Sequence, residues 1–382
     1  MTEQIYKECL DVEKADDQTL LEIKNLRIGF SSRRGTQYAV DGVSFHVDQG
    51  EIVGIVGESG SGKSVMSQSI LRLLEYDSNV AYEGEILFQG EDILKFNKKQ
   101  LQKLRGNDIS MIFQNPLTSL SQVHTVGLQL SEILMLHKGM KKKEALERSV
   151  ELLGLTGIPK PENAIKKYPF ELSGGMQQRV MIAMALACEP KLLIADEPTT
   201  ALDVTIQEQI LNLIVELNQK TNMAVLFITH DMGVVSQLCD RVKVMYLGQV
   251  VEEAPTDVLF ENPKHPYTEG LLACVPSLDS DKEKPLPVIK GTVPPLSKIP
   301  AGCHFCTRCS LVDERCKNEL PPDCCIAPDH VVKCWRFVQN GDVLNGDDEF
   351  CAGDKNSRST GNNVSLHNGD DEFCADENSE VK

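Results

Sequence analysis

The run from Gly57 to Ser64 constrains this chain most, because it fits the phosphate-binding pattern G-x-x-x-x-G-K-[ST]. An apolar run at 51–56 predicts a buried parallel strand before it, and 65–74 predicts a helix after it. Glycines in such a loop let backbone N–H groups surround phosphate oxygens at a helix N-terminus. A Gly/Ser-rich turn that binds nothing is the alternative, and the flanking strand and helix count against it. The predicted nucleotide-binding residues are Gly57, Glu58, Ser59, Gly60, Ser61, Gly62, Lys63 and Ser64.

Within this loop, Lys63 would reach the β- and γ-phosphates of a nucleotide, and Ser64 would ligate Mg²⁺.

Length and charge narrow the class of protein. A chain of 382 residues predicts about two to three domains. It contains no apolar run of the roughly 18–20 residues that cross a bilayer, and its first residues lack the pattern of a signal peptide. We therefore expect a cytosolic chain whose membrane role is peripheral. The net charge of −17 argues against nucleic acid as the main partner, because phosphate contacts need a basic surface.

The two ends of the chain differ in composition from its middle. Residues 1–19 are polar and acidic and predict a flexible leader. Residues 338–382 carry eleven Asp/Glu against three Lys/Arg, and the segment 345–352 recurs at 368–375. We interpret them as a disordered acidic tail with a duplicated segment. Its acidic clusters could attract a divalent metal, but a solvated tail is the simpler interpretation, and no function follows from it.

Before the phosphate loop, alternating residues from Leu20 onward predict antiparallel strands around a turn at 33–35. Phe30 and Tyr38 flank this turn. Either ring could stack on an adenine, and packing on its own sheet is the equal alternative. Further along, the spacing of apolar residues at 126–154 predicts a helical insertion.

Polar side chains follow three further predicted strands directly. They are Gln114 after 109–113, Asp196 and Glu197 after 191–195, and His230 after 224–229. In an α/β sheet, ligands are met at the carboxyl ends of the strands. Asp196 suits Mg²⁺ coordination, and Glu197 is placed to polarise a water. Gln114 or His230 alone could be a satisfied core residue, but their order with the phosphate loop counts against that.

A second glycine-containing segment, 172–179, opens another predicted helix. Ser173 is a good helix cap, and the two glycines beside it leave backbone amides bare. This arrangement suits a second anion site.

In this order, the motifs resemble the ATP-binding cassette (ABC) family over about residues 20–262. The matching pieces are the Walker A loop at 57–64, Gln114 as the Q-loop, 172–177 as the signature, 192–197 as Walker B, 201–203 as the D-loop and His230 as the switch histidine. The resemblance implies an α/β P-loop NTPase fold with an antiparallel β subdomain, a helical subdomain at about 116–170 and a small Cys-rich C-terminal extension.

The resemblance also implies a mechanism in which two cassettes pack head to tail. The signature of one chain would contact the γ-phosphate held by Lys63 of the other. Glu197 would act as general base, His230 would hold the γ-phosphate and link it to Glu197, and Gln114 would contact Mg²⁺ and the attacking water. The implied nucleotide-binding set adds Phe30, Tyr38, Ser173, Gly174, Gly175, Gln177 and Asp203 to the loop, and the implied Mg²⁺ ligands are Ser64, Gln114 and Asp196.

A second resemblance covers about residues 252–337, and we assign 263–337 to it as a domain. The run His265-Pro266-Tyr267-Thr268 and the later Gly302-Cys303 are similar to the C-terminal extension of oligopeptide/dipeptide importer ATPases. This narrows the expected class to a peptide- or nickel-type importer subunit.

The cysteines of this region predict a metal site. Cys303, Cys309, Cys316 and Cys334 have the spacing that is associated with a [4Fe–4S] cluster in that family extension. Zinc and reduced structural thiols are the alternatives, and the additional Cys306, Cys324 and Cys325 leave the ligand set open. An iron–sulfur cluster or a zinc ion would mainly hold together a small, proline-rich segment that has little core of its own.

These observations predict an ATP-binding and ATP-hydrolysing subunit of an ABC importer, which couples hydrolysis to uptake of di- or oligopeptides. The implied partners are a second ABC ATPase (a paralogue or a copy), two membrane permeases and an extracytoplasmic solute-binding protein. The implied location is the cytoplasmic face of the inner membrane. Alternatives are a nickel or other small-solute importer, a soluble ABC ATPase acting on ribosomes or DNA, and a redox or metal sensor. The solute itself lies beyond what this chain encodes.

Overall fold

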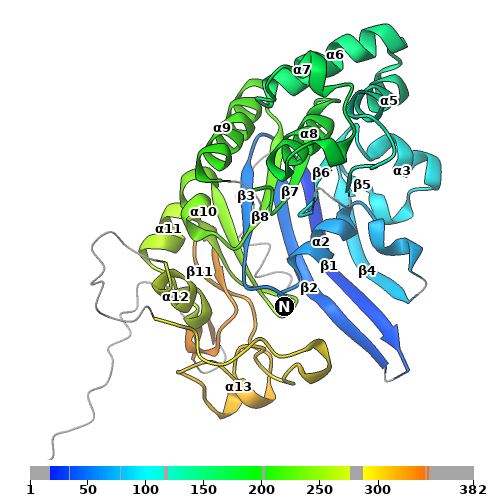
Figure 1. Cartoon of the computed structure of the whole chain (residues 1–382). Helices are drawn as coiled ribbons and strands as arrows, with labels where there is room; N and C mark the ends of the chain where they lie inside the picture. Colours follow the sequence, from blue (N-terminus) through cyan, green and yellow to red (C-terminus); the bar gives the residue numbers. More distant parts are fainter. Residues whose placement is uncertain are drawn as a thin grey trace, which may run out of the picture. The chain divides into compact units, whose positions relative to one another are not determined.

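Two main β-sheets and the helices around them form most of the part of the chain that the computed structural model describes (Figure 1). A short antiparallel pair, β13 (Val338–Gln339) and β14 (Asp342–Val343), forms a third sheet. The described residues are 18–33, 35–77, 79–115, 119–199, 203–275, 287–339 and 342–343. Most of the predicted leader, most of the acidic tail including its repeat, and Ala201 and Leu202 of the D-loop lie outside these residues.

The smaller sheet has the strand order β2-β1-β4-β5, and its neighbouring strands are antiparallel. Its strands are β1 (Thr19–Ser32), β2 (Gly35–Asp48), β4 (Val80–Phe88) and β5 (Glu91–Asp92). Buried and accessible residues alternate along much of β2. The antiparallel strands predicted upstream of the phosphate loop are therefore confirmed.

The larger sheet has the order β11-β12-β10-β9-β3-β8-β7-β6. Its strands are β3 (Ile52–Val56), β6 (Ile109–Ile112), β7 (Leu192–Asp196), β8 (Ala224–Thr229), β9 (Arg241–Tyr246), β10 (Gln249–Pro255), β11 (Cys324–Ala327) and β12 (His330–Val332). β9, β3, β8, β7 and β6 are parallel, and the three remaining strands join antiparallel at one edge. All residues of β3, β6, β7 and β8 are buried, which is typical of parallel strands covered on both faces.

Alternate residues of the central strands contribute to two different cores, because successive side chains point to opposite faces. Leu193 and Ala195 of β7 belong to a core that includes residues of α8, α9 and α10. Leu192 and Ile194 belong to a core that lies against the smaller sheet and includes Met66 of α2. This double burial holds the carboxyl ends of the strands in fixed positions.

Some of the helices cover the sheets, and others form a separate helical layer. They are α2 (Lys63–Ile70), α3 (Lys98–Leu104), α5 (Val126–Lys138), α6 (Lys142–Leu155), α7 (Pro161–Ala164), α8 (Gly174–Leu186), α9 (Val204–Thr221), α10 (Met232–Leu238), α11 (Thr256–Glu261), α12 (Pro266–Ala273) and α13 (Glu314–Asn318). A core of its own, which includes Leu130 of α5, Leu153 of α6 and Val180 of α8, joins the helices of this layer. The helical insertion predicted at 126–154 corresponds to α5 and α6.

The C-terminal extension adds strands to the larger sheet instead of folding apart from it. β12 pairs antiparallel with β10, and β11 pairs with β12. Tyr267 and Phe305 of the extension are buried in the same core as the central strands. We expected an extension with little core that metal would mainly hold together. Its main support is instead its packing against residues far away in the sequence.

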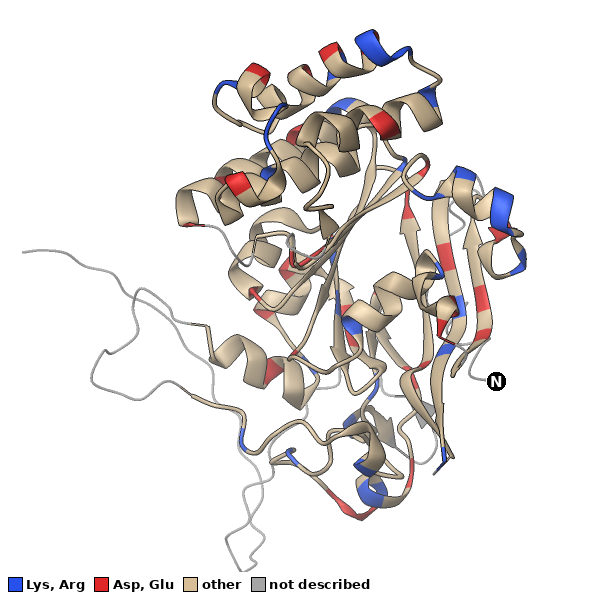
Figure 2. Cartoon of the chain, turned by 45° about the vertical axis from the view of Figure 1, so that its right-hand side comes forward, with Lys and Arg blue, Asp and Glu red and all other residues tan. Residues whose placement is uncertain are grey.

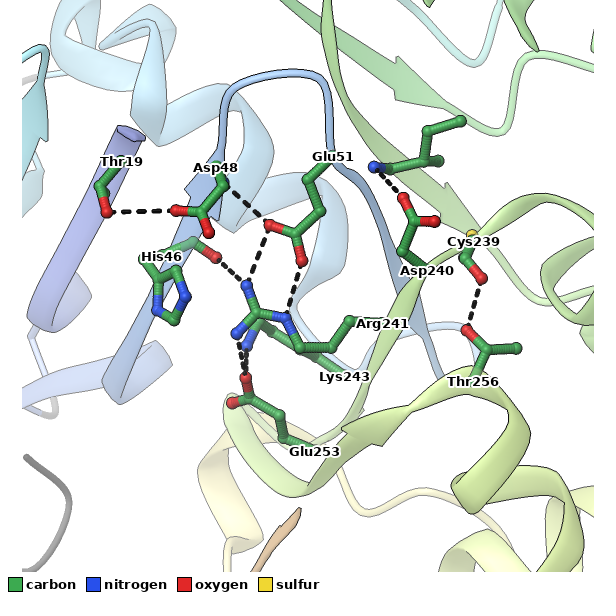
Figure 3. A network of polar contacts seen from close by, with 11 residues as sticks. Thr19, His46, Asp48, Glu51, Cys239, Asp240, Arg241, Lys243, Glu253 and Thr256 are labelled. Atoms are coloured by element: carbon green, nitrogen blue, oxygen red, sulfur yellow. Dashed lines mark hydrogen bonds and ion pairs between the residues drawn. The ribbon is translucent and has the colours of Figure 1, made fainter. Parts of the chain in front are cut away.

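A buried network of charges joins the start of β3 to β9, β10 and the smaller sheet (Figure 3). The Arg241 guanidinium donates to both Glu51 oxygens at 2.9 and 3.0 Å, to Glu253 Oε1 at 3.0 Å and to the His46 carbonyl at 3.0 Å. Lys243, which is fully buried, also pairs with Glu253. Burial lowers the pKa of Lys243 to about 8, and the two cations hold the pKa of Glu253 low against the effect of burial. The network fixes the strand that leads into the phosphate loop.

Lys/Arg and Asp/Glu are interspersed over the helices and strands of the described chain (Figure 2). Within these same residues, no helix is both long and apolar enough to cross a membrane.

Candidate nucleotide and hydrolysis site

The phosphate loop follows β3 and adopts a conformation that glycine permits. Gly57 and Gly62 have φ angles of +151° and +103°, and Gly62 is the N-cap of α2. An added Cβ would lie 2.2 Å from the Met245 carbonyl oxygen at Gly57, and 2.4 Å from the Ala39 carbonyl oxygen at Gly62. Ser59 and Gly60 form the exposed tip. This narrow backbone cradle at a helix N-terminus fits the phosphates of a nucleotide.

The Lys63 ammonium group lies inside this loop. Its Nζ donates to the carbonyl oxygens of Gly57 at 2.6 Å and Glu58 at 3.1 Å. Burial lowers the pKa of Lys63, while Glu197, Asp196 and Glu58 act in the opposite direction. A desolvated cation surrounded by loop carbonyls is suited to contact an anionic phosphate.

Ser64 and Asp196 offer a pair of oxygen ligands beside the loop. The Ser64 hydroxyl donates to Asp196 Oδ1 at 3.2 Å, and Asp196 is buried at the end of β7. Burial, assisted by the charge of Glu197, raises the pKa of Asp196. Because a cation would relieve this unfavourable charge and hydroxyl and carboxylate oxygens suit Mg²⁺, these residues fit a magnesium ion.

Glu197 connects the ends of three neighbouring strands. β8, β7 and β6 lie side by side, so that His230, Glu197 and Gln114 follow them at one edge of the sheet. Gln114 Nε2 donates to Glu197 Oε2 at 2.7 Å, and His230 Nδ1 lies 3.1 Å from Glu197 Oε1. Glu197 has a left-handed backbone with φ +47°, a conformation that costs a non-glycine residue about 1–3 kcal/mol and is typical of functional sites. The structure thus brings together the three predicted catalytic residues.

The signature segment opens α8. Ser173 caps the helix, accepting from the Met176 amide at 3.4 Å; Gly174 is exposed and Gly175 is half-buried. Gln177, which we grouped with the nucleotide-binding residues, is buried instead. Its Nε2 donates to the carbonyls of Pro169 at 2.9 Å and Leu172 at 3.2 Å, so its side chain supports the segment before the helix.

Asp203, predicted in the D-loop, caps α9 by accepting from the Ile206 amide at 2.9 Å.

The two aromatic candidates lie on opposite faces of the β1–β2 ribbon. Tyr38 pairs with Gly29, and the next residue, Phe30, points to the other face and packs on the core. The Tyr38 hydroxyl donates to Glu83 at 2.9 Å, and the Arg27 guanidinium lies 4.6 Å from its ring centre. One face of the Tyr38 ring is therefore already engaged by a cation.

The four predicted cysteine ligands lie in one region of the extension. Burial raises the pKa of Cys303 to about 11, and the neighbouring thiols of Cys316 and Cys309 add to the effect. Burial likewise raises the pKa of Cys334 to about 12. Among the described residues, no group of three or more His, Cys, Asp or Glu is placed to hold a metal ion.

Two contacts of the phosphate loop were missed at the sequence level. The Gly248 amide, in the turn between β9 and β10, donates to the Ser61 carbonyl at 2.8 Å. The Tyr267 hydroxyl accepts from the Glu58 amide at 2.8 Å. A glycine in a turn gives no signal of such a contact in the sequence. Tyr267 stands in the His-Pro-Tyr-Thr run, and that run was the available signal.

A phosphate loop beside an oxygen pair that fits a magnesium ion, with a Gln–Glu–His arrangement at one sheet edge, defines a P-loop ATPase of the cassette type. Comparison with family models agrees. The model described as "ABC transporter" matches residues 40–200, and the one described as "Oligopeptide/dipeptide transporter, C-terminal region" matches residues 251–316. The chain belongs to the ABC transporter ATPases, in the group that carries this C-terminal region.

Characterised relatives are similar over nearly their whole length. The oligopeptide transport ATP-binding protein AppD of Bacillus subtilis (strain 168) is 50% identical over 323 residues, which cover 85% of this chain and 98% of that protein. The dipeptide transport ATP-binding protein DppD of the same organism is 48% identical over 332 residues, covering 86% and 99%.

Solved structures share the fold. The ATP-binding cassette MJ0796, solved as a dimer in a post-hydrolysis state bound to ADP and Pi, matches with a TM-score of 0.57 and 30% identity, covering 62% of this chain and 99% of that one. The cbiO1 protein of Clostridium perfringens, part of the ABC transporter complex cbiONQ, matches with a TM-score of 0.54 and 30% identity, covering 64% and 92%. The fold predicted from the motifs is confirmed.

Proposed function

We propose that this chain is the ATP-hydrolysing subunit of an importer that carries di- or oligopeptides across a membrane. The observation that carries the proposal is the meeting of Gln114 and His230 on the two oxygens of Glu197, next to the magnesium ligand Asp196. The relatives named as oligopeptide and dipeptide transport ATP-binding proteins support this solute class.

In this proposal, each group at the sheet edge has a distinct task. Lys63 and the loop amides bind the β- and γ-phosphates, and Ser64 and Asp196 hold Mg²⁺, which supplies charge neutralisation. Glu197 accepts a proton from the attacking water. Gln114 and His230 each hold one Glu197 oxygen, so they orient the carboxylate, and catalysis consists of positioning and electrostatics.

A single chain supplies half of each site. Ser173, Gly174 and Gly175 present bare amides that would face the phosphate bound by a second cassette, and Asp203 would lie at the contact between the two. The dimeric state of the MJ0796 cassette supports this arrangement. Phe30 and Tyr38 stay candidates for the adenine contact.

Replacing the proposed base tests the chemistry. Glu197→Gln keeps the size of the side chain and removes its ability to accept a proton, so ATP should still bind while hydrolysis falls by about 10²- to 10⁴-fold. Glu216→Gln, on the exposed pair of Glu216 and Lys220 in α9, is the matched control. Single-turnover hydrolysis and nucleotide titration measure the two effects. Full turnover by Glu197→Gln would remove this residue from the role of base.

The proposed partners are a second ABC ATPase, two membrane permeases and an extracytoplasmic solute-binding protein, with this chain at the cytoplasmic face of the inner membrane. Purification of the tagged chain from membranes should recover permease subunits. Their absence would contradict the importer. Uptake of labelled dipeptide by a deletion strain, compared with uptake of nickel, then identifies the solute class.

We also propose that Cys303, Cys309, Cys316 and Cys334 bind a [4Fe–4S] cluster, with zinc as the alternative. Their spacing and their proximity support it, although no group of three or more potential ligands among the described residues is placed to hold a metal ion. Iron, sulfide and zinc analysis of anaerobically purified protein tests the idea, and metal-free protein would end it.

A further inference from the structure

The C-terminal extension contacts the phosphate loop directly at Glu58. Arg308 makes a two-pronged ion pair with the Glu58 carboxylate, in which Nη2 lies 3.0 Å from Oε1 and Nη1 pairs with Oε2. The Arg308 side chain is 3% exposed and that of Glu58 is 31% exposed. On the same residue, the Glu58 amide donates to the Tyr267 hydroxyl at 2.8 Å. The extension thus holds both the backbone and the side chain of this loop residue.

The extension also contacts the phosphate loop indirectly, through the turn between β9 and β10. His304 Nδ1 lies 2.9 Å from the carbonyl oxygen of Leu247, in the turn between β9 and β10. The next residue, Gly248, donates its amide to the Ser61 carbonyl at 2.8 Å. An added Cβ at Gly248 would lie 2.8 Å from the Ala39 carbonyl, so this turn has little room to shift.

The groups that contact the loop are held by an aromatic cluster. The ring centres of Tyr246 and Tyr267 are 4.7 Å apart, and Phe305 lies 5.2 Å from Tyr246 and 5.3 Å from Tyr267. All three side chains are nearly or fully buried in the core that contains the central strands. Such packing fixes rotamers, so Arg308, three residues after Phe305, meets Glu58 from a rigid support.

The pair between Arg308 and Glu58 also has an electrostatic effect on the site. A carboxylate in a loop that binds an anionic triphosphate repels the ligand, and the repulsion is strong where water is partly excluded. A bidentate arginine offsets that charge and keeps the carboxylate in one geometry.

We propose that Arg308 and Tyr267 are positioning residues of the nucleotide site, which neutralise and orient Glu58 so that the phosphate loop accepts ATP. The inference rests on the proposed function and adds the extension to the ATP site. Neither residue touches the Gln114–Glu197–His230 arrangement through any contact that the structure describes. Their loss should therefore act on ATP binding and KM, and leave kcat nearly unchanged.

Opposite effects of two charge-removing variants test the proposal. In the full-length chain, Arg308→Gln should raise the Kd for ATP about tenfold, because it leaves an unpaired carboxylate in the loop. Glu58→Gln should lower the Kd, because it leaves the Arg308 cation unpaired beside the loop, and the double variant should return to within about twofold of the wild type. Tyr267→Phe, which removes the acceptor of the Glu58 amide, should raise the Kd about fivefold.

A purely structural role predicts a different pattern. If the pair only holds the fold together, Glu58→Gln and Arg308→Gln weaken ATP binding alike and the double variant gives no rescue, which overturns the proposal. Arg336→Gln, which removes another ion pair of the extension at 3.3 Å from Glu269, controls for general destabilisation and should leave the Kd unchanged. Failure of the wild-type chain to bind ATP would refute the proposed function instead. An Arg308→Gln variant that binds ATP normally would refute this inference alone.

Discussion

Replacing Gly174 by alanine should change the stability and the activity of this chain in opposite directions. Gly174 is the first residue of α8 and is exposed, and an added Cβ would meet no atom within 4 Å. Its φ is not positive, so alanine fits the backbone. Because alanine restricts the unfolded chain and favours a helix, Gly174→Ala should stabilise the fold by up to about 1 kcal/mol.

The same methyl group should inactivate the composite site. In the proposed dimer, the amide of Gly174 faces the phosphate on the partner cassette, and a methyl group there would displace it by about 1 Å or more. A misplacement of that size costs on the order of 10²-fold in rate. ATP binding to the single chain should not change, because its own phosphate loop is intact.

Thermal unfolding of the single chain and steady-state ATPase activity of the complex assembled with its partner cassette measure both effects. Gly154→Ala is the matched control: Gly154 is exposed in α6, and an added Cβ would have its nearest neighbour at 4.0 Å. It should raise stability without any change in activity. Full ATPase activity of Gly174→Ala would refute the reasoning that this glycine faces a nucleotide.

Three other substitutions test the loop and a buried histidine. Gly60 has φ +83° and an added Cβ would meet no atom within 4 Å, so Gly60→Ala should cost only about 1–2 kcal/mol of backbone strain. Gly62 has φ +103°, and an added Cβ would lie 2.4 Å from the Ala39 carbonyl oxygen. Gly62→Ala should therefore destabilise the fold far more than Gly60→Ala. Equal losses in thermal unfolding would contradict this. Burial lowers the pKa of His265 from 6.5 to about 4, so the unfolded chain binds the extra proton in this window and stability should fall by about 3 kcal/mol as the pH drops through it. His265 Nδ1 accepts a hydrogen bond from the Tyr267 amide. In urea unfolding at a series of pH values, His265→Asn should flatten the dependence of the free energy of unfolding on pH between about 4 and 6.5. An unchanged pH dependence in this variant would contradict the assignment to His265.

The central site was predictable because its geometry follows from local rules. Polar residues that directly follow buried parallel strands meet at one edge of the sheet, so Glu197, Gln114 and His230 could be grouped before any distance was known. Gln177 shows where such reasoning stops. A motif gives the residue type, whereas the direction of a side chain depends on neighbours such as the Pro169 carbonyl.

Contacts between distant segments could not be predicted in the same way. Arg308 and Glu58 are 250 residues apart, and no periodicity or spacing links them. For Phe30 and Tyr38, irregular pairing of β1 with β2 decides which face each ring occupies. Such irregularities arise from packing between strands and leave little trace in composition.

The pairing of β12 with β10 changes which strand ends the sheet. Without it, the seven-residue β10 would present unpaired amides and carbonyls, an invitation to pair with other molecules. The pairing passes the edge to β11, which has four residues. It also encloses Glu252, which has no exposed surface and receives His330 Nε2 at 2.9 Å and the Lys264 amide at 2.7 Å. A chain truncated after residue 262 would therefore expose β10 as an unpaired edge strand and would leave the Glu252 carboxylate without these two partners. We expect the truncated chain to aggregate under conditions in which the longer chain stays in solution.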